Sequence, residues 1–118
     1  MDMSSSLQTV VLLILSNIFM TFAWYGHLKY KTYPIFLVIL ASWGIAFFEY
    51  CLQVPANRIG HGVFSAPQLK VLQEGITFAV FALFSWWYLR EKPTLYDNIA
   101  FLTIMLGVAI SVFQPKAN

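Results

Sequence analysis

Charged side chains are scarce in this sequence: Asp, Glu, Lys and Arg make up 10% of its 118 residues, against about 25% in an average soluble domain. A shortage this deep means that most of the molecular surface faces something other than water. The formal net charge of +2 is small and the basic residues are scattered, which argues against a nucleic-acid partner. Hydrophobic residues account for 59% of the chain and aromatic residues for 18%. The composition therefore predicts an integral membrane protein whose main partner is the lipid bilayer.

Cysteine is almost missing as well. Cys51 is the single cysteine, so no internal disulfide can form. The sequence also contains no phosphate-cradling loop, no cluster of metal ligands and no nucleophile–base constellation. These absences predict a protein that is not an enzyme and that binds neither a metal nor a cofactor.

Long apolar runs are what the chain does contain. Each is close to the 20 or so residues that a helix needs to cross a bilayer, and three polar breaks separate them. The prolines Pro34 and Pro55 frame the second run, and Pro55 is expected to end its helix. The predicted fold is an all-α integral membrane bundle of four transmembrane helices, in a single domain covering residues 1–118. The predicted spans are residues 7–26, 34–54, 69–89 and 95–113.

Two acids stand inside these runs, near the same polar connection. Glu49 lies six residues before Pro55, and Glu74 lies seven after Pro67. If both prolines mark helix ends, each carboxyl is about 9–10 Å inside its helix and both enter from the same membrane face. Polar residues cluster around them, and Asn17 is the strongly polar residue inside the first span. The substrate-binding or ion-coupling candidates are Glu49, Glu74, Gln53, Asn57, Arg58, Lys70, Gln73 and Asn17.

Two roles remain open for the acids. Two carboxylates brought close in a low dielectric cannot easily both ionise, so the pair could exchange a proton for a cationic or polar solute. Lys70 or Arg58 could instead neutralise the pair permanently, which would make it a structural clamp.

The fourth span carries small residues along one side. Ala100, Thr103, Gly107 and Ser111 follow one another at three- and four-residue steps, which permits close approach of another helix. Four helices filled by Phe, Trp and Leu side chains leave little room for a pathway. We therefore expect a homodimer with this ridge as its candidate interface.

Three segments resemble one family of small bacterial membrane proteins. They are FMTFAWYGHLK, ASWGIAFFEYCLQVPANRIG and APQLKVLQEGITFAVFALFSWWYL, which together cover nearly the whole chain. They resemble the domain-of-unknown-function 486 family, which is placed in the drug/metabolite transporter superfamily. The resemblance implies a four-helix half transporter in the bacterial cytoplasmic (inner) membrane, multi-pass and dimeric. In the superfamily's small multidrug resistance transporters the dimer is antiparallel and a first-helix glutamate couples transport to protons. Here that helix has Asn17 and no acid, so their coupling residue is not carried over.

The sequence thus predicts a secondary transporter of the drug/metabolite transporter superfamily. It would move an unknown small polar or cationic solute, coupled to protons through the membrane-embedded glutamates. The alternative is a non-transporting membrane scaffold or interaction protein, in which the polar cluster only fastens the helix bundle.

Overall fold

Four long helices make up the protein, and the computed structural model describes residues 3–115. A short 3₁₀ turn, Gly26–Lys29, follows the first helix, and a π-helical stretch, Ser85–Leu89, continues the third. All four helices are long and apolar enough to cross a membrane. The predicted all-α bundle with four candidate spans is therefore confirmed. The helices are α1 (Met3–Tyr25), α2 (Ile35–Gly60), α3 (Ala66–Phe84) and α4 (Leu95–Val112).

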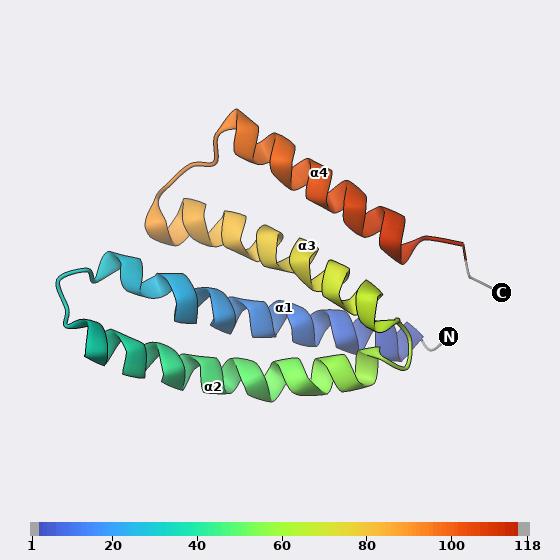
Figure 1. Cartoon of the computed structure of the whole chain (residues 1–118), viewed down its shortest axis with the longest axis horizontal. Helices are drawn as coiled ribbons and strands as arrows, with labels where there is room; N and C mark the ends of the chain where they lie inside the picture. Colours follow the sequence, from blue (N-terminus) through green and yellow to red (C-terminus); the bar gives the residue numbers. More distant parts are fainter. Residues whose placement is uncertain (1–2, 116–118) are drawn as a thin grey trace.

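The helices are arranged around α1, which lies between α2 and α3, while α4 packs on the far side of α3 (Figure 1). The α1–α2 and α3–α4 connections lie at one end of the molecule, and the α2–α3 connection lies at the other. The molecule measures 55 × 35 × 19 Å, so its thin dimension is only about two helix diameters. A bundle this thin exposes most of its apolar side chains, as expected of helices surrounded by lipid.

The second helix is longer than the sequence indicated. The prediction that Pro55 ends this helix is wrong, because α2 continues through Pro55 to Gly60. A proline inside a helix removes one backbone hydrogen bond, but tertiary packing holds the turn that follows it. Ala56 is fully buried, and a Cβ added to Gly60 would lie 2.7 Å from Leu69 Cδ2 and 2.7 Å from Thr9 Cγ2. The last turn of α2 is therefore wedged between α1 and α3.

The third helix begins earlier than predicted, at Ala66. Ser65 caps it: its side chain accepts a hydrogen bond from the backbone of Gln68, whose side chain accepts one from the backbone of Ser65 in return. This reciprocal cap satisfies two backbone donors at the helix start. The predicted long connection over residues 55–68 shrinks to residues 61–65.

The core is centred on α1 and is partly polar. Thr9, Ser16, Asn17 and Thr21 of this helix are all buried, beside Leu13. The Thr9 and Thr21 hydroxyls donate to carbonyls one turn back, Ser5 O and Asn17 O, each at 2.7 Å. A buried hydroxyl satisfied in this way carries little cost in an apolar setting. The polar face of α1 is thus free to meet polar side chains from its two neighbours.

The fourth helix packs on α3 through a glycine. A Cβ added to Gly75 would lie 2.8 Å from Val108 Cγ2, so the missing side chain permits the close approach of α3 and α4. Gln68 Nε2 also donates to Ser111 O at 3.1 Å. Elsewhere α4 is open, and a Cβ on Gly107 would meet nothing within 4 Å.

Candidate functional site

Four polar side chains form one hydrogen-bonded group between α1, α2 and α3. Ser16 Oγ donates to Gln53 Oε1 at 2.6 Å, and Gln53 Nε2 donates to Gln73 Oε1. Gln73 Nε2 in turn donates to Asn57 Oδ1 at 2.6 Å. We call Ser16, Gln53, Gln73 and Asn57 the amide network. It contains no charged group, and it joins the three helices in the half of the bundle nearer the α2–α3 connection.

Asn17 lies deeper on α1 and belongs to a separate link. Its Nδ2 donates to Leu13 O at 2.7 Å, and its Oδ1 accepts from Thr77 Oγ1 of α3 at 2.6 Å. The side chain is 1% exposed. Because both ends of the amide are satisfied, this residue has the geometry of a fastener between α1 and α3.

Glu49 lies near the middle of α2, on the side that packs against α1. It is one helical turn from Gln53, which contacts Ser16 of α1, and it follows Phe48, whose ring stacks on Phe19 of α1 at 6.1 Å between centroids. Eleven residues separate Glu49 from the end of α2, a depth of about 16 Å. With this span of 26 residues centred in a hydrocarbon layer roughly 30 Å thick, Glu49 lies about 12 Å inside the layer, deeper than the sequence indicated.

The carboxyl of Glu49 lacks polar partners for one of its two oxygen atoms among residues 3–115. Its Oε2 atom is shielded from solvent and has no hydrogen-bond partner among residues 3–115. Within the same residues, Glu49 takes part in no ion pair. A half-buried acid without a basic partner is rare in a membrane helix and marks a candidate functional group.

Glu74 is placed quite differently. Its Oε1 lies 2.8 Å from Lys70 Nζ, one turn earlier on α3, and the two side chains are 48% and 74% exposed. The structure thus puts this acid on the outer face of α3, eight residues or about 12 Å from the helix start. The prediction that Glu49 and Glu74 lie at the same depth assumed that α2 ends at Pro55, which it does not. The structure does not join Glu49 and Glu74 in one cluster. Arg58 is exposed in the last turn of α2.

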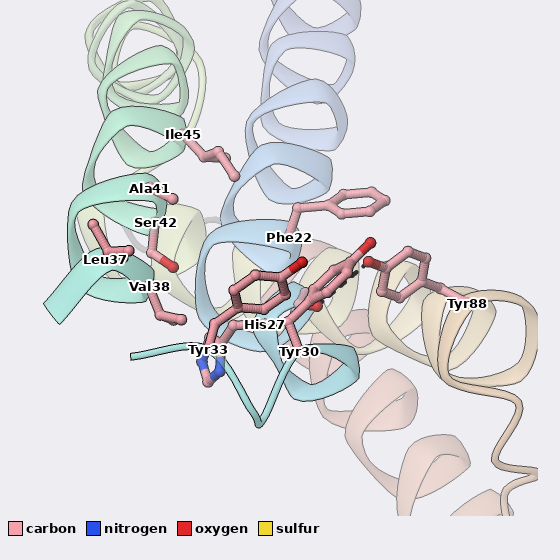
Figure 2. Close-up of a pocket in the computed structure, with 11 residues that line it drawn as sticks. Phe22, His27, Tyr30, Tyr33, Leu37, Val38, Ala41, Ser42, Ile45 and Tyr88 are labelled. Atoms are coloured by element: carbon pink, nitrogen blue, oxygen red, sulfur yellow. Dashed lines mark hydrogen bonds between the residues drawn. The ribbon is translucent and has the colours of Figure 1, made fainter. Parts of the chain in front are cut away.

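A second feature, missed from the sequence, lies at the opposite end of the bundle. A cleft of about 320 Å³ is lined by Phe22, Tyr30, Tyr33 and Tyr88, with Ser42 and Ile45 from α2. In Figure 2 the rings of Tyr33 and Tyr30 lie between the α2 side chains and Tyr88. Lys29 Nζ lies 4.1 Å from the centroid of the Tyr88 ring, a cation–π contact. Two tyrosines three residues apart in the first link were the signal that could have revealed this cleft.

Residues 3–115 contain no group of three or more His, Cys, Asp or Glu side chains placed to hold an ion. The four candidate spans define a multi-pass helical membrane protein. Its amide network is uncharged, and Glu49 of α2 makes no ion pair within residues 3–115. Residues 9–113 match a family model described as "Putative member of DMT superfamily (DUF486)". The chain belongs to this family, whose superfamily is one of drug/metabolite transporters rather than enzymes. No curated protein and no solved structure matches the chain significantly.

Proposed function

We propose that the protein is half of a secondary transporter that exchanges protons for a small polar or cationic solute at Glu49. The observation that carries this proposal is the Oε2 atom of that residue, near the middle of α2, which is shielded from solvent and has no hydrogen-bond partner among residues 3–115. An unpaired carboxylate in a membrane interior costs several kcal/mol. The group must therefore hold either a proton or a cation, and alternation between the two is the basis of coupled exchange.

The amide network supports the same role. Gln53 is one turn from Glu49, and Gln73 and Asn57 continue the network towards the α2–α3 connection. Uncharged amides offer donors and acceptors to a polar solute without adding a second charge. Their bonds join three different helices, so a movement of α2 against α3 exchanges these bonds for bonds to the solute at small net cost.

For Glu74 we propose the structural role, in which a basic residue neutralises the acid permanently. Lys70 already neutralises it at 2.8 Å on the same helix, so it needs no proton to remain in place. The pair therefore acts in structure or assembly, and the coupling acid is Glu49 alone.

The working unit in this proposal is a homodimer in the bacterial cytoplasmic membrane. The ridge of Ala100, Thr103, Gly107 and Ser111 supports it, because the first three residues are exposed on α4 and Gly107 has open space where a side chain would be. A bundle only 19 Å thick is also too thin to enclose a solute pathway by itself.

The alternative function, a non-transporting scaffold, draws support from Asn17. Its amide is fully satisfied by Leu13 and Thr77, as expected of a polar residue that only fastens helices. This alternative gives no reason for an acid inside a membrane span whose Oε2 atom has no hydrogen-bond partner among residues 3–115, so we place it second.

Proton movement in liposomes tests the proposal. Purified protein is reconstituted with a pH-sensitive dye inside, and guanidinium or tetramethylammonium is added outside. Wild-type protein is expected to move protons in response to at least one of the two cations. Glu49→Gln should abolish this movement while leaving the melting temperature close to that of the wild type.

Glu91→Gln is the matched control, since it makes the same isosteric change at an exposed acid of the α3–α4 connection, outside the four helices. It should retain proton movement. Equal flux in Glu49→Gln and wild type would reject the coupling role. A wild-type protein that moves no protons with either cation would instead favour the scaffold.

A further inference from the structure

The ion pair between Lys70 and Glu74 is exposed on the outer face of a membrane helix. Phe78, one turn further along the same face, is 40% exposed, and the two charged side chains are 74% and 48% exposed. About half or more of each charged side chain is therefore open to whatever surrounds the helix. This face carries full charges, whereas a lipid-facing helix surface is normally apolar.

The depth of the pair shows why hydrocarbon cannot be its cover. The third candidate span, Ala66–Leu89, has 24 residues, about 36 Å of helix against a hydrocarbon layer of roughly 30 Å. With the span centred, Lys70 lies about 3 Å inside the layer and Glu74 about 9 Å inside. A lysine at that depth can extend its ammonium group to the headgroups. The shorter glutamate side chain cannot, so the ion pair that it forms with Lys70 at 2.8 Å lies partly within the layer, where two charges facing hydrocarbon favour a polar cover.

We propose that a second copy of this chain, inserted in the same orientation, covers this face, so that Lys70 of each copy pairs with Glu74 of the other. The inference rests on the dimer of the proposed function and assigns its geometry. A two-fold interface brings the same surface of both copies together, so every residue needs a complement on its own surface. A base and an acid one turn apart on one face meet that need.

The depth of Lys70 and Glu74 in the membrane favours a parallel dimer over an antiparallel one. In a parallel pair of α3 helices, the two ion pairs lie at the same depth in the membrane. Along the membrane normal, Lys70 of one copy is then as far from Glu74 of the other copy as it is from Glu74 of its own helix. In an antiparallel pair the two glutamates are about 10 Å apart along the membrane normal. Each glutamate then lies at the level of Phe81 of the other copy, where no charge is available. The parallel dimer departs from the antiparallel arrangement that the resemblance implied.

The charged face of α3 continues onto α4, so the proposed dimer interface includes both helices. Phe78 and Ala100 line one cleft of about 400 Å³ between α3 and α4. Ala100 is the first residue of the small ridge, so the ridge adjoins the charged face. The parallel contact therefore brings the α3 charges and the α4 ridge into one interface.

Cysteine crosslinking in lipid tests the orientation with the ion pair intact. In a Cys51→Ala background, Pro67→Cys lies one turn before Lys70 on the same face, far from the middle of the span. A parallel dimer predicts strong disulfide crosslinking at position 67. Leu83→Cys, 69% exposed on the opposite face of α3, is the control and should not crosslink. Crosslinking at Phe78→Cys, near mid-span, without any at position 67 would overturn the parallel arrangement.

A charge exchange then tests the pairing itself. Lys70→Glu gives each copy two acids, and Glu74→Lys gives each copy two bases. Each variant alone should therefore lose at least about tenfold in crosslinked dimer, because like charges in contact repel each other. Co-expression of the two variants should restore crosslinking. Single variants that crosslink like the parent, or a mixture that stays uncrosslinked, would overturn the pairing. The proton-flux assay separates the failure of this inference from the failure of the proposed function. A crosslinking result that contradicts the pairing rejects only the interface. Unchanged proton flux in Glu49→Gln rejects only the coupling role of Glu49.

Discussion

Gln73→Leu is expected to lower the free energy of unfolding by about 2 kcal/mol or more. The change removes both an acceptor and a donor from the amide network, leaving Gln53 Nε2 and Asn57 Oδ1 without partners. Each polar group stranded in an apolar interior costs about 1–3 kcal/mol. Hydrogen bonds between membrane helices are weaker on average, which places the expected loss at the lower end of the sum. Unfolding of the protein in mixed micelles by increasing denaturing detergent measures this free energy.

A double substitution provides the control for the Gln73 prediction. Adding Gln53→Leu to Gln73→Leu removes one of the stranded groups, so the double variant should lose less than the sum of the two single losses. Ser16 and Asn57 then remain as the unpaired members. Strict additivity of the two single losses would show that the amides do not act as one network.

Gly75→Leu is expected to separate α4 from α3 and to cost a further large share of the stability. Even the first carbon of a side chain at this position would lie 2.8 Å from Val108 Cγ2 and 3.4 Å from Met105 Sδ. Overpacking of a close contact typically costs about 1–3 kcal/mol, occasionally more. The melting temperature and the protease sensitivity of the α3–α4 connection measure the effect.

Gly107→Leu is the matched control, because it makes the same change in a helix of similar composition. Nothing lies within 4 Å of the Cβ position at Gly107, so this variant should keep the melting temperature of the monomer fold. Its effect should fall on self-association, which crosslinking measures. Equal loss of stability in both variants would contradict the packing of α4 through Gly75. An unchanged dimer in Gly107→Leu would remove the ridge from the interface.

The four helices were predictable from run length alone, since each apolar run has to satisfy its own backbone while crossing the bilayer. Helix ends were less accessible. Pro55 normally signals an end, but its effect was overridden by burial of Ala56 and by the close packing of Gly60 on Thr9 and Leu69. That packing depends on contacts between distant residues, and no local pattern contains it.

The sequence predicted most of the polar residues of the candidate site but not which of them contact one another. Gln53, Gln73, Asn57 and Asn17 were expected to be functional polar residues, and the structure brings the first three into one network. Ser16 was missed because a serine in a membrane helix usually bonds its own backbone. The predicted pairing of Glu49 with Glu74 is wrong because Glu74 lies on the exposed face of α3 beside Lys70, and because α1 lies between much of α2 and α3 (Figure 1). Residue spacing along single helices cannot show the order in which helices pack.

Infrared difference spectroscopy of the protein in lipid membranes tests the coupling role of Glu49 most directly. The C=O stretch of a protonated carboxyl is resolved from the bands of a carboxylate, so a change of bulk pH shows whether a buried acid exchanges its proton. We expect an acid band that appears and disappears with pH in the wild type and in Glu74→Gln. The same band should be missing in Glu49→Gln. A pH-dependent acid band that survives unchanged in Glu49→Gln would contradict the assignment of Glu49 as the proton-exchanging group.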